Sequence, residues 1–197
     1  MDPGTLLAGL QRASRSPPEI IKQVITRIQS DYSKSNNRSR AVVLDVDDSV
    51  ILAQPRASKL VIPEMHQLYE LLVKLGFRIF FVTARPYSPD NAQFTEKQLM
   101  VFGFGTYEKL FLMPRSFLKG TNGTSAFKYL TRRYIQDTLG AEIVLNIGDS
   151  VSDLVVLPPF SSNTREIKII QKLDNKLTFL FEPLELSQLA IKLPYTL

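Results

Sequence analysis

The chain has 197 residues, of which 44% are hydrophobic and 22% are charged, and its formal net charge is +5. This length suits one compact domain, and the composition excludes a disordered or fibrous protein. No apolar run approaches the ~20 residues that a membrane span needs, and the absence of cysteine excludes disulfides and thiolate metal sites. Since no secretory signal is visible, we expect the protein in the cytoplasm or elsewhere inside a cell.

The positive charge is concentrated in residues 1–40, where basic residues outnumber acidic ones. Such a segment favours phosphate-rich partners, either nucleic acid or a membrane surface. A solvated helix and linker explain the same charges, and we favour this simpler interpretation.

Helices and strands are predicted in alternation along the chain. Pro17-Pro18 precedes an amphipathic helix that continues to about residue 32, and a polar loop follows it. The later apolar patterns predict, in order, a strand over 41–46, a helix over 63–75, a strand over 78–83, a helix over 88–104, a strand over 109–113, a helix over 124–139, a strand over 142–147, a short helix from about Ser152 and a strand over 177–181.

Most of the predicted strands contain a continuous apolar run, which is typical of a parallel sheet covered by helices on both faces. The predicted fold class is therefore α/β, a doubly wound, Rossmann-like sheet. Residues 17–197 are expected to form a single domain, and the order of residues 1–16 stays open.

Polar side chains follow three of the predicted strands. The first strand leads into Asp45, Asp47 and Asp48, the second ends at Thr83 followed by Ala84 and Arg85, and the strand over 142–147 leads into Asp149 and Asp153. A single acid after a strand is commonly a helix cap. Because ligands bind beyond the carboxyl ends of open α/β sheets, three such strand ends indicate a functional site.

The acids predict a magnesium site. Asp45 and Asp47 are two residues apart and would point to one face if the strand continued that far. Carboxylates held together need a cation or a shared proton, and Asp149 and Asp153 add to the cluster. Hard oxygen ligands of this kind suit Mg²⁺. The single histidine, His66, lies in a predicted helix and is expected to be a surface or packing residue.

A phosphate beside such a cluster would be repelled unless positive charge and hydrogen-bond donors also faced it. Thr83 offers a hydroxyl at the second strand end, and Lys128 lies early in a predicted helix. Lysines on helices are mostly solvated, so the value of Lys128 as a signal depends on the order of the motifs.

That order resembles the haloacid dehalogenase (HAD) superfamily of phosphohydrolases: Asp-x-Asp-x-Ser after a strand, a strand ending in Thr, a helical Lys, and Gly-Asp-x-x-x-Asp after a strand. The segments FVTARP, SAFKYLTRR, NIGDSVSDL and the terminal IKLPY are similar to the class B/C and plant-type acid phosphatase branch. The resemblance runs from about Ile20 to the C-terminus.

The resemblance implies a phosphomonoester hydrolase that works through an aspartyl-phosphate, with a small phosphorylated molecule such as a nucleotide as substrate. Asp45 would be the nucleophile and Asp47 the general acid and base. Thr83 and Lys128 would hold the transferring phosphoryl group, with Ala84 and Arg85 beside it on the substrate side.

The resemblance also implies a Mg²⁺ site that includes Asp45, the main-chain oxygen of Asp47, and Asp149, while Asp153 would orient Lys128 or a metal-bound water. Asp48 and Ser49 stand where this branch has Glu and where the superfamily has Thr or Val. We expect neither difference to abolish catalysis.

The intervals between the motifs are short, so no large cap domain is expected, and the site should be open. An open site admits nucleotides, phosphorylated nucleic-acid ends and phosphoproteins, with the basic segment slightly favouring nucleic acid. A receiver-type phosphoacceptor is disfavoured because the acids lie at the first strand and Asp149 comes last. A catalytically silent storage or binding protein on the same fold is the remaining alternative.

Overall fold

The computed structural model describes residues 17–32, 39–52, 60–61, 63–119, 123–153 and 189–192. The strand expected over 177–181 and the N-terminal residues 1–16 lie outside these ranges. The division into 1–16 and one domain over 17–197 stays a prediction.

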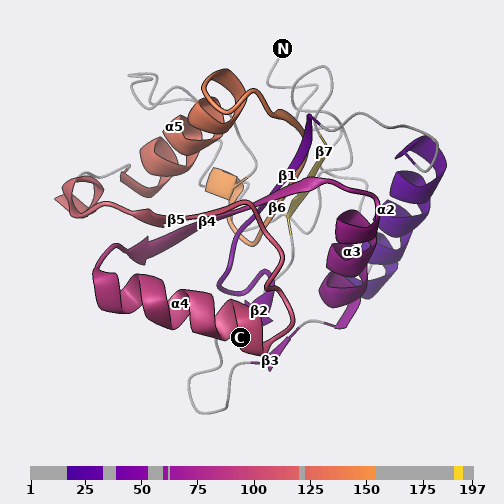
Figure 1. Ribbon diagram of the computed structural model, residues 1–197, viewed down its shortest axis with the longest axis horizontal. Coiled ribbons are helices and arrows are strands. Elements are labelled where there is room, and N and C mark those ends of the chain that lie inside the picture. The colour runs from indigo at the N-terminus through magenta and orange to yellow at the C-terminus, as the bar shows by residue number, and fades with distance from the viewer. Residues whose placement is uncertain are drawn as a thin grey trace.

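A five-stranded sheet forms the centre of the structure (Figure 1). Its strands lie in the order β5-β4-β1-β6-β7, and every neighbouring pair is parallel. Their bounds are β1 (Arg40–Leu44), β4 (Arg78–Pro86), β5 (Lys109–Met113), β6 (Glu142–Gly148) and β7 (Leu189–Lys192). Since the strands run outward from β1 in both directions, the doubly wound α/β prediction is confirmed.

In the described part of the chain, four α-helices connect or flank the strands: α2 (Pro17–Tyr32), α3 (Pro63–Lys74), α4 (Pro89–Val101) and α5 (Gly123–Asp137). Each was expected close to these bounds. The largest difference is the end of α4, which stops at Val101 because the chain turns at Phe102 and continues through Gly103 with a φ of 83°.

The two faces of the sheet carry two separate hydrophobic cores. Val42 and Leu44 of β1 belong to the first core, and Ala41 and Val43 belong to the second, as the alternation of side chains along a strand requires. Apolar residues of α2 and α3 join the first core and those of α5 join the second. In Figure 1, α2 and α3 accordingly lie together on one side of the sheet and α5 lies on the other.

Four short elements complete the described structure: the antiparallel pair β2 (Ile51–Leu52) and β3 (Leu60–Val61), and the 3-10 helices η1 (Arg115–Lys119) and η2 (Val151–Asp153). β2, β3 and β7 were not predicted. Two to four residues are too few to show the alternation that identifies a strand. In the described ranges, none of the helices combines the length and apolar character needed to cross a membrane.

Candidate active site

The strand register brings three of the predicted strand ends to one edge of the sheet. Leu44, the last residue of β1, pairs with Phe81 of β4 and with Ile147 of β6. The chain beyond Leu44 is also tied to β6, because the backbone N–H of Asp45 donates to the carbonyl of Ile147 at 2.9 Å. Asp45 and Asp149 therefore leave neighbouring strands at the same edge, and Thr83, two residues beyond Phe81 in β4, lies at that edge as well.

The chain turns tightly after β1, and this turn separates Asp45 from Asp47. The backbone N–H groups of Val50 and Ile51 both donate to the carbonyl of Val46, and Asp48 adopts a left-handed conformation with a φ of 57°. Because β1 ends at Leu44 instead of residue 46, the two carboxylates do not share a strand face. They contact different partners.

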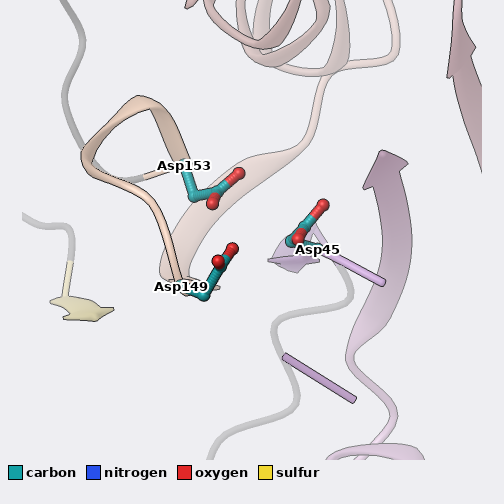
Figure 2. Close-up of side chains that lie close together, drawn as sticks. All are labelled: Asp45, Asp149 and Asp153. Carbon is teal, nitrogen blue, oxygen red and sulfur yellow. The ribbon is translucent and has the colours of Figure 1, made fainter. Parts of the chain in front are cut away.

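Asp45 lies in a cluster with Asp149 and Asp153. One carboxylate oxygen from each of the three lies within 4.8 Å of the others, and Asp45 and Asp153 are buried. Figure 2 shows the three carboxylates turned toward a common space, with Asp149 and Asp153 on the segment that follows β6. Gly148, at the end of β6, packs so closely on the Asp153 side chain that any added Cβ would overlap it.

Lys128 of α5 places its ammonium between two of these acids. Its Nζ lies 3.1 Å from Oδ1 of Asp45 and is also hydrogen-bonded to Oδ1 of Asp153. Burial alone would lower the pKa of Lys128, but the charges of Asp153 and Asp45 raise it above its ordinary value. The ammonium therefore stays charged inside the protein.

The charge of the cluster is not fully offset by Lys128. Burial, followed by the charge of Asp153, raises the pKa of Asp45 to about 8, against the opposing effect of Lys128. Burial and Asp153 likewise raise the pKa of Asp149 to about 6. Three carboxylates face one ammonium, so a divalent cation could offset the negative charge that the ammonium leaves uncompensated.

The donor set fits magnesium. All three clustered side chains offer carboxylate oxygen, the hard ligand that Mg²⁺ prefers. Asp153 already accepts hydrogen bonds from Lys128 and, through Oδ2, from the backbone N–H of Ser150 at 3.0 Å. Asp45 also accepts hydrogen bonds, from Lys128 and Ser49, so these contacts do not separate the three acids, and each of them could supply an oxygen to the ion.

Asp47 forms an ion pair with Arg85. Nε and Nη2 of Arg85 donate to the two carboxylate oxygens of Asp47 at 2.7 and 2.8 Å. The side chain of Asp47 is not a member of the three-acid cluster. The atom of Asp47 that was expected to contact the metal is its main-chain oxygen, which the ion pair with Arg85 does not involve.

Thr83 is buried inside β4, which continues past it to Pro86. The strand was expected to end at Thr83, but the pairing with β5 shifts between Thr83 and Pro86 and so carries the strand further. The Thr83 hydroxyl accepts a hydrogen bond from the backbone N–H of Arg85 at 3.2 Å. Ala84 has no polar side-chain atom, so only its backbone can contact a phosphate.

Two residues support the site through contacts that were not predicted from the sequence, although Ser49 belongs to the Asp-x-Asp-x-Ser motif. The buried Ser49 hydroxyl donates to Oδ2 of Asp45 at 3.3 Å. Arg132, also buried, donates to the backbone carbonyls of Asp153 and Ser152 at 3.0 and 3.1 Å. The spacing of Arg132, one helical turn after Lys128, was a readable signal, because residues four apart share a helix face.

His66 lies away from the acid cluster, on α3. Its ring packs edge-on against Phe104, with 5.4 Å between ring centroids, and its Nδ1 is 3.5 Å from Glu70. It also lines an open surface hollow of about 630 Å³ with Val61 and Val101. The expectation of a surface or packing residue agrees with these contacts.

Comparison with known proteins identifies the family. The model of the HAD superfamily, subfamily IIIB (acid phosphatase), matches residues 53–179, more than half of the chain. The match includes Thr83, Lys128, Asp149 and Asp153 and begins after the turn that carries Asp45 and Asp47. None of the curated proteins matches the sequence.

Two solved structures share the fold. The class C acid phosphatase from Bacillus anthracis with tungstate bound has a TM-score of 0.58 and 18% identity, over 98% of this chain and 84% of that chain. A chain of the Pnkp1/Rnl/Hen1 complex has a TM-score of 0.51 and 11% identity, over 84% of this chain and 50% of that chain. On the family match and this shared fold, the chain belongs to the acid phosphatases of subfamily IIIB of the HAD superfamily.

Proposed function

We propose that this protein is a Mg²⁺-dependent phosphomonoester hydrolase that forms an aspartyl-phosphate, a covalent acyl phosphate, on Asp45. The observation that carries the proposal is the environment of the Asp45 carboxylate. It is buried at a strand end, receives hydrogen bonds from Lys128 and Ser49, and faces two further acids. A nucleophile in this setting is held in one orientation and needs a cation to remain ionised.

The reaction would proceed in two steps. An oxygen of Asp45 attacks phosphorus, the bond to the leaving oxygen breaks, and Asp47 gives that oxygen a proton. Asp47 then takes a proton from water, whose oxygen attacks the phosphorus, and the acyl-phosphate bond between phosphorus and the Asp45 oxygen breaks to release phosphate. Lys128 would stabilise the negative charge of the phosphoryl oxygens in both steps, because its ammonium stays charged at the site.

Asp45, Asp149 and the main-chain oxygen of Asp47 would hold the metal ion. When bound, Mg²⁺ would offset the negative charge of the carboxylates and of the phosphoryl oxygens. Asp153 would orient Lys128, because one of its carboxylate oxygens accepts a hydrogen bond from the ammonium while the other accepts one from the backbone N–H of Ser150.

The Thr83 hydroxyl and the backbone of Ala84 would hold the phosphoryl oxygens from the β4 side. Thr83 emerges beside the β1 end, since β1 and β4 pair in parallel up to Leu44 and Phe81. We infer a small phosphomonoester such as a nucleotide as the substrate. Phosphorylated nucleic-acid ends and phosphoproteins are the alternative substrates, and the substrate panel described next includes both.

The test is hydrolysis of a generic aryl phosphate by the purified chain, with Mg²⁺ and with EDTA. Turnover that requires the metal would support the proposal, and a panel of nucleotides, sugar phosphates, phosphorylated oligonucleotides and a phosphoprotein would define the substrate class. Thermal stabilisation by tungstate, a tetrahedral oxyanion, gives a readout independent of turnover. Stabilisation without turnover at any pH from mildly acidic to mildly basic, with Mg²⁺, Mn²⁺ or Co²⁺, would identify a silent binding protein instead.

A further inference from the structure

We propose that Thr95 and Gln98 of α4 are positioning residues for the proton transfers of Asp47, and that they act through Arg85. This inference rests on the proposed function, because it assumes that Asp47 protonates the leaving group. The two α4 side chains lie 10 and 13 positions beyond Arg85 in the sequence, and both accept hydrogen bonds from its guanidinium.

Arg85 holds both oxygens of the Asp47 carboxylate. Its Nε and Nη2 donate to Oδ2 and Oδ1 at 2.7 and 2.8 Å. A planar guanidinium that contacts both oxygens restrains the distance and also the rotation of the carboxylate plane. The orientation of Asp47 therefore depends on where Arg85 is held.

Thr95 and Gln98 hold Arg85 from the opposite side. Nη1 of Arg85 donates to Oγ1 of Thr95 at 3.0 Å and to Oε1 of Gln98 at 2.7 Å. The two acceptors are three residues apart on α4, so they lie on one face of the helix. Both are uncharged, so they fix the guanidinium without competing with Asp47 for its charge.

The four hydrogen bonds engage all three guanidinium nitrogens of Arg85. A guanidinium has five N–H donors, and most of this capacity is therefore used inside the protein. That saturation favours a positioning role for Arg85 over direct binding of the substrate phosphate. It also favours α4 as the support of the Asp47 side chain.

The supporting helix is itself well fixed. β4, which carries Arg85, leads directly into α4 (Figure 1). The Ser88 side chain caps α4 by accepting the backbone N–H of Asn91, and Leu99 is fully buried in the first core. Thr95, on the same buried side of the helix, is 0% exposed. Rigid support of this kind is what a proton donor needs to stay aligned with its leaving group.

Leaving-group chemistry provides the test. A general acid accelerates departure of a basic alkoxide, whereas dinitrophenolate leaves without a proton. We would compare kcat/KM for an alkyl phosphate and for 2,4-dinitrophenyl phosphate in Thr95→Val, Gln98→Met and the double variant. Gln93→Met, an exposed glutamine on the same helix, is the matched control. Asp47→Asn defines the limit of a complete loss.

We expect the double variant to lose at least about tenfold in kcat/KM for the alkyl phosphate, since general acids contribute about 10²–10⁴-fold. For the dinitrophenyl ester we expect a loss below about threefold, as protonation is not needed there. Gln93→Met should behave as wild type with both esters. Each single variant should show a smaller effect of the same selectivity, which covers the case of a double variant that fails to fold.

Equal losses with the two esters, or an equal rise in KM, would overturn the inference and assign Arg85 to the phosphate or to general stability. Wild-type rates in all α4 variants would also overturn it. Failure of the proposed function is distinguishable, because then wild-type protein would show no turnover or Asp45→Asn would retain it. The inference would fall with that proposal.

Discussion

Nζ of Lys128 lies 3.1 Å from Oδ1 of Asp45, although 83 positions separate the two residues in the sequence. Both side chains are at least nine-tenths buried, at 4% and 5% relative exposure. The pair forms only where α5 packs on the sheet beside the end of β1. Docking of this helix therefore assembles the fold and the charge arrangement of the site in one step.

Replacement of Asp45 by Asn is expected to remove nearly all phosphatase activity while the protein stays folded. The amide keeps the shape of the carboxylate but cannot act as the nucleophile. Steady-state rates with an aryl phosphate, together with circular dichroism and thermal unfolding, check both expectations. Asp90→Asn, an exposed acid in the first turn of α4, is the control. A rate near wild type for Asp45→Asn would remove Asp45 from the mechanism.

Replacement of Lys128 by Met is expected to abolish activity and to lower the free energy of unfolding by about 3–5 kcal/mol at neutral pH, because it leaves buried carboxylates without their ammonium. The loss should be smaller at pH 5 than at neutral pH, because Asp149, whose pKa is raised to about 6, then takes up a proton and less buried negative charge is left without the ammonium. Urea unfolding at the two pH values measures the difference.

Lys97→Met is the matched control for this lysine, because Lys97 is exposed on α4. We expect its free energy of unfolding to stay within about 0.5 kcal/mol of wild type, as is usual for surface substitutions. If the two variants lost equal stability, the buried charge of Lys128 would not be the cause.

The sheet was readable from the sequence because parallel strands are buried on both faces. The runs at 41–44 and 143–145 are continuously apolar, and this identified β1 and β6 together with the α/β class. β2 and β3 escaped prediction, since two-residue strands have no periodicity and depend on their pairing. The extension of β4 to Pro86 likewise depends on pairing with β5.

The site was predictable as a set of positions and less so as a set of contacts. Asp45 and Asp149 were expected at one sheet edge, because the carboxyl ends of parallel strands meet there. The ion pair of Asp47 with Arg85 depends on the left-handed turn at Asp48, and no spacing rule reports that geometry. The contact of Ser49 with Asp45 comes from the same turn.

In the metal-free protein, stability is expected to fall as pH rises from about 4 toward 8. Asp45 and Asp149 have pKa values raised from 3.8 to about 8 and about 6 in the fold. In this interval the folded chain binds more protons than the unfolded chain, so each rise in pH favours unfolding. Thermal unfolding in EDTA at a series of pH values measures the slope. Asp45→Asn, which lacks the larger shift, should show a shallower slope.

Added Mg²⁺ is expected to stabilise the protein more at pH 8 than at pH 5. A cation binds the ionised carboxylates and displaces their protons, so its binding tightens as pH rises. Calorimetric titration in two buffers of different ionisation enthalpy would show the release of protons near pH 6 and 7. Stabilisation that is equal at pH 5 and pH 8 would contradict the assignment of Asp45 and Asp149 as ligands.

Two adjacent arginines on α5 differ in their surroundings. Arg132 is buried and donates to the backbone carbonyls of Asp153 and Ser152. Arg133 is 51% exposed and pairs with Asp137, an exposed residue four positions further along the helix. The two side chains have the same chemistry, so differences between their variants report their surroundings.

Arg132→Met is expected to lower the free energy of unfolding by about 2–4 kcal/mol, because buried carbonyls lose a charged donor. Arg133→Met should change it by less than about 0.5 kcal/mol, as exposed ion pairs contribute little. Activity should follow the same order, since η2 carries Asp153 and Asp153 orients Lys128. Arg132→Lys keeps the charge but cannot hydrogen-bond to both carbonyls at once, so its free energy of unfolding and its activity should lie between those of Arg132→Met and wild type. If Arg132→Lys matched wild type in rate and stability, charge alone would suffice, and the fork of hydrogen bonds to η2 would not position Asp153.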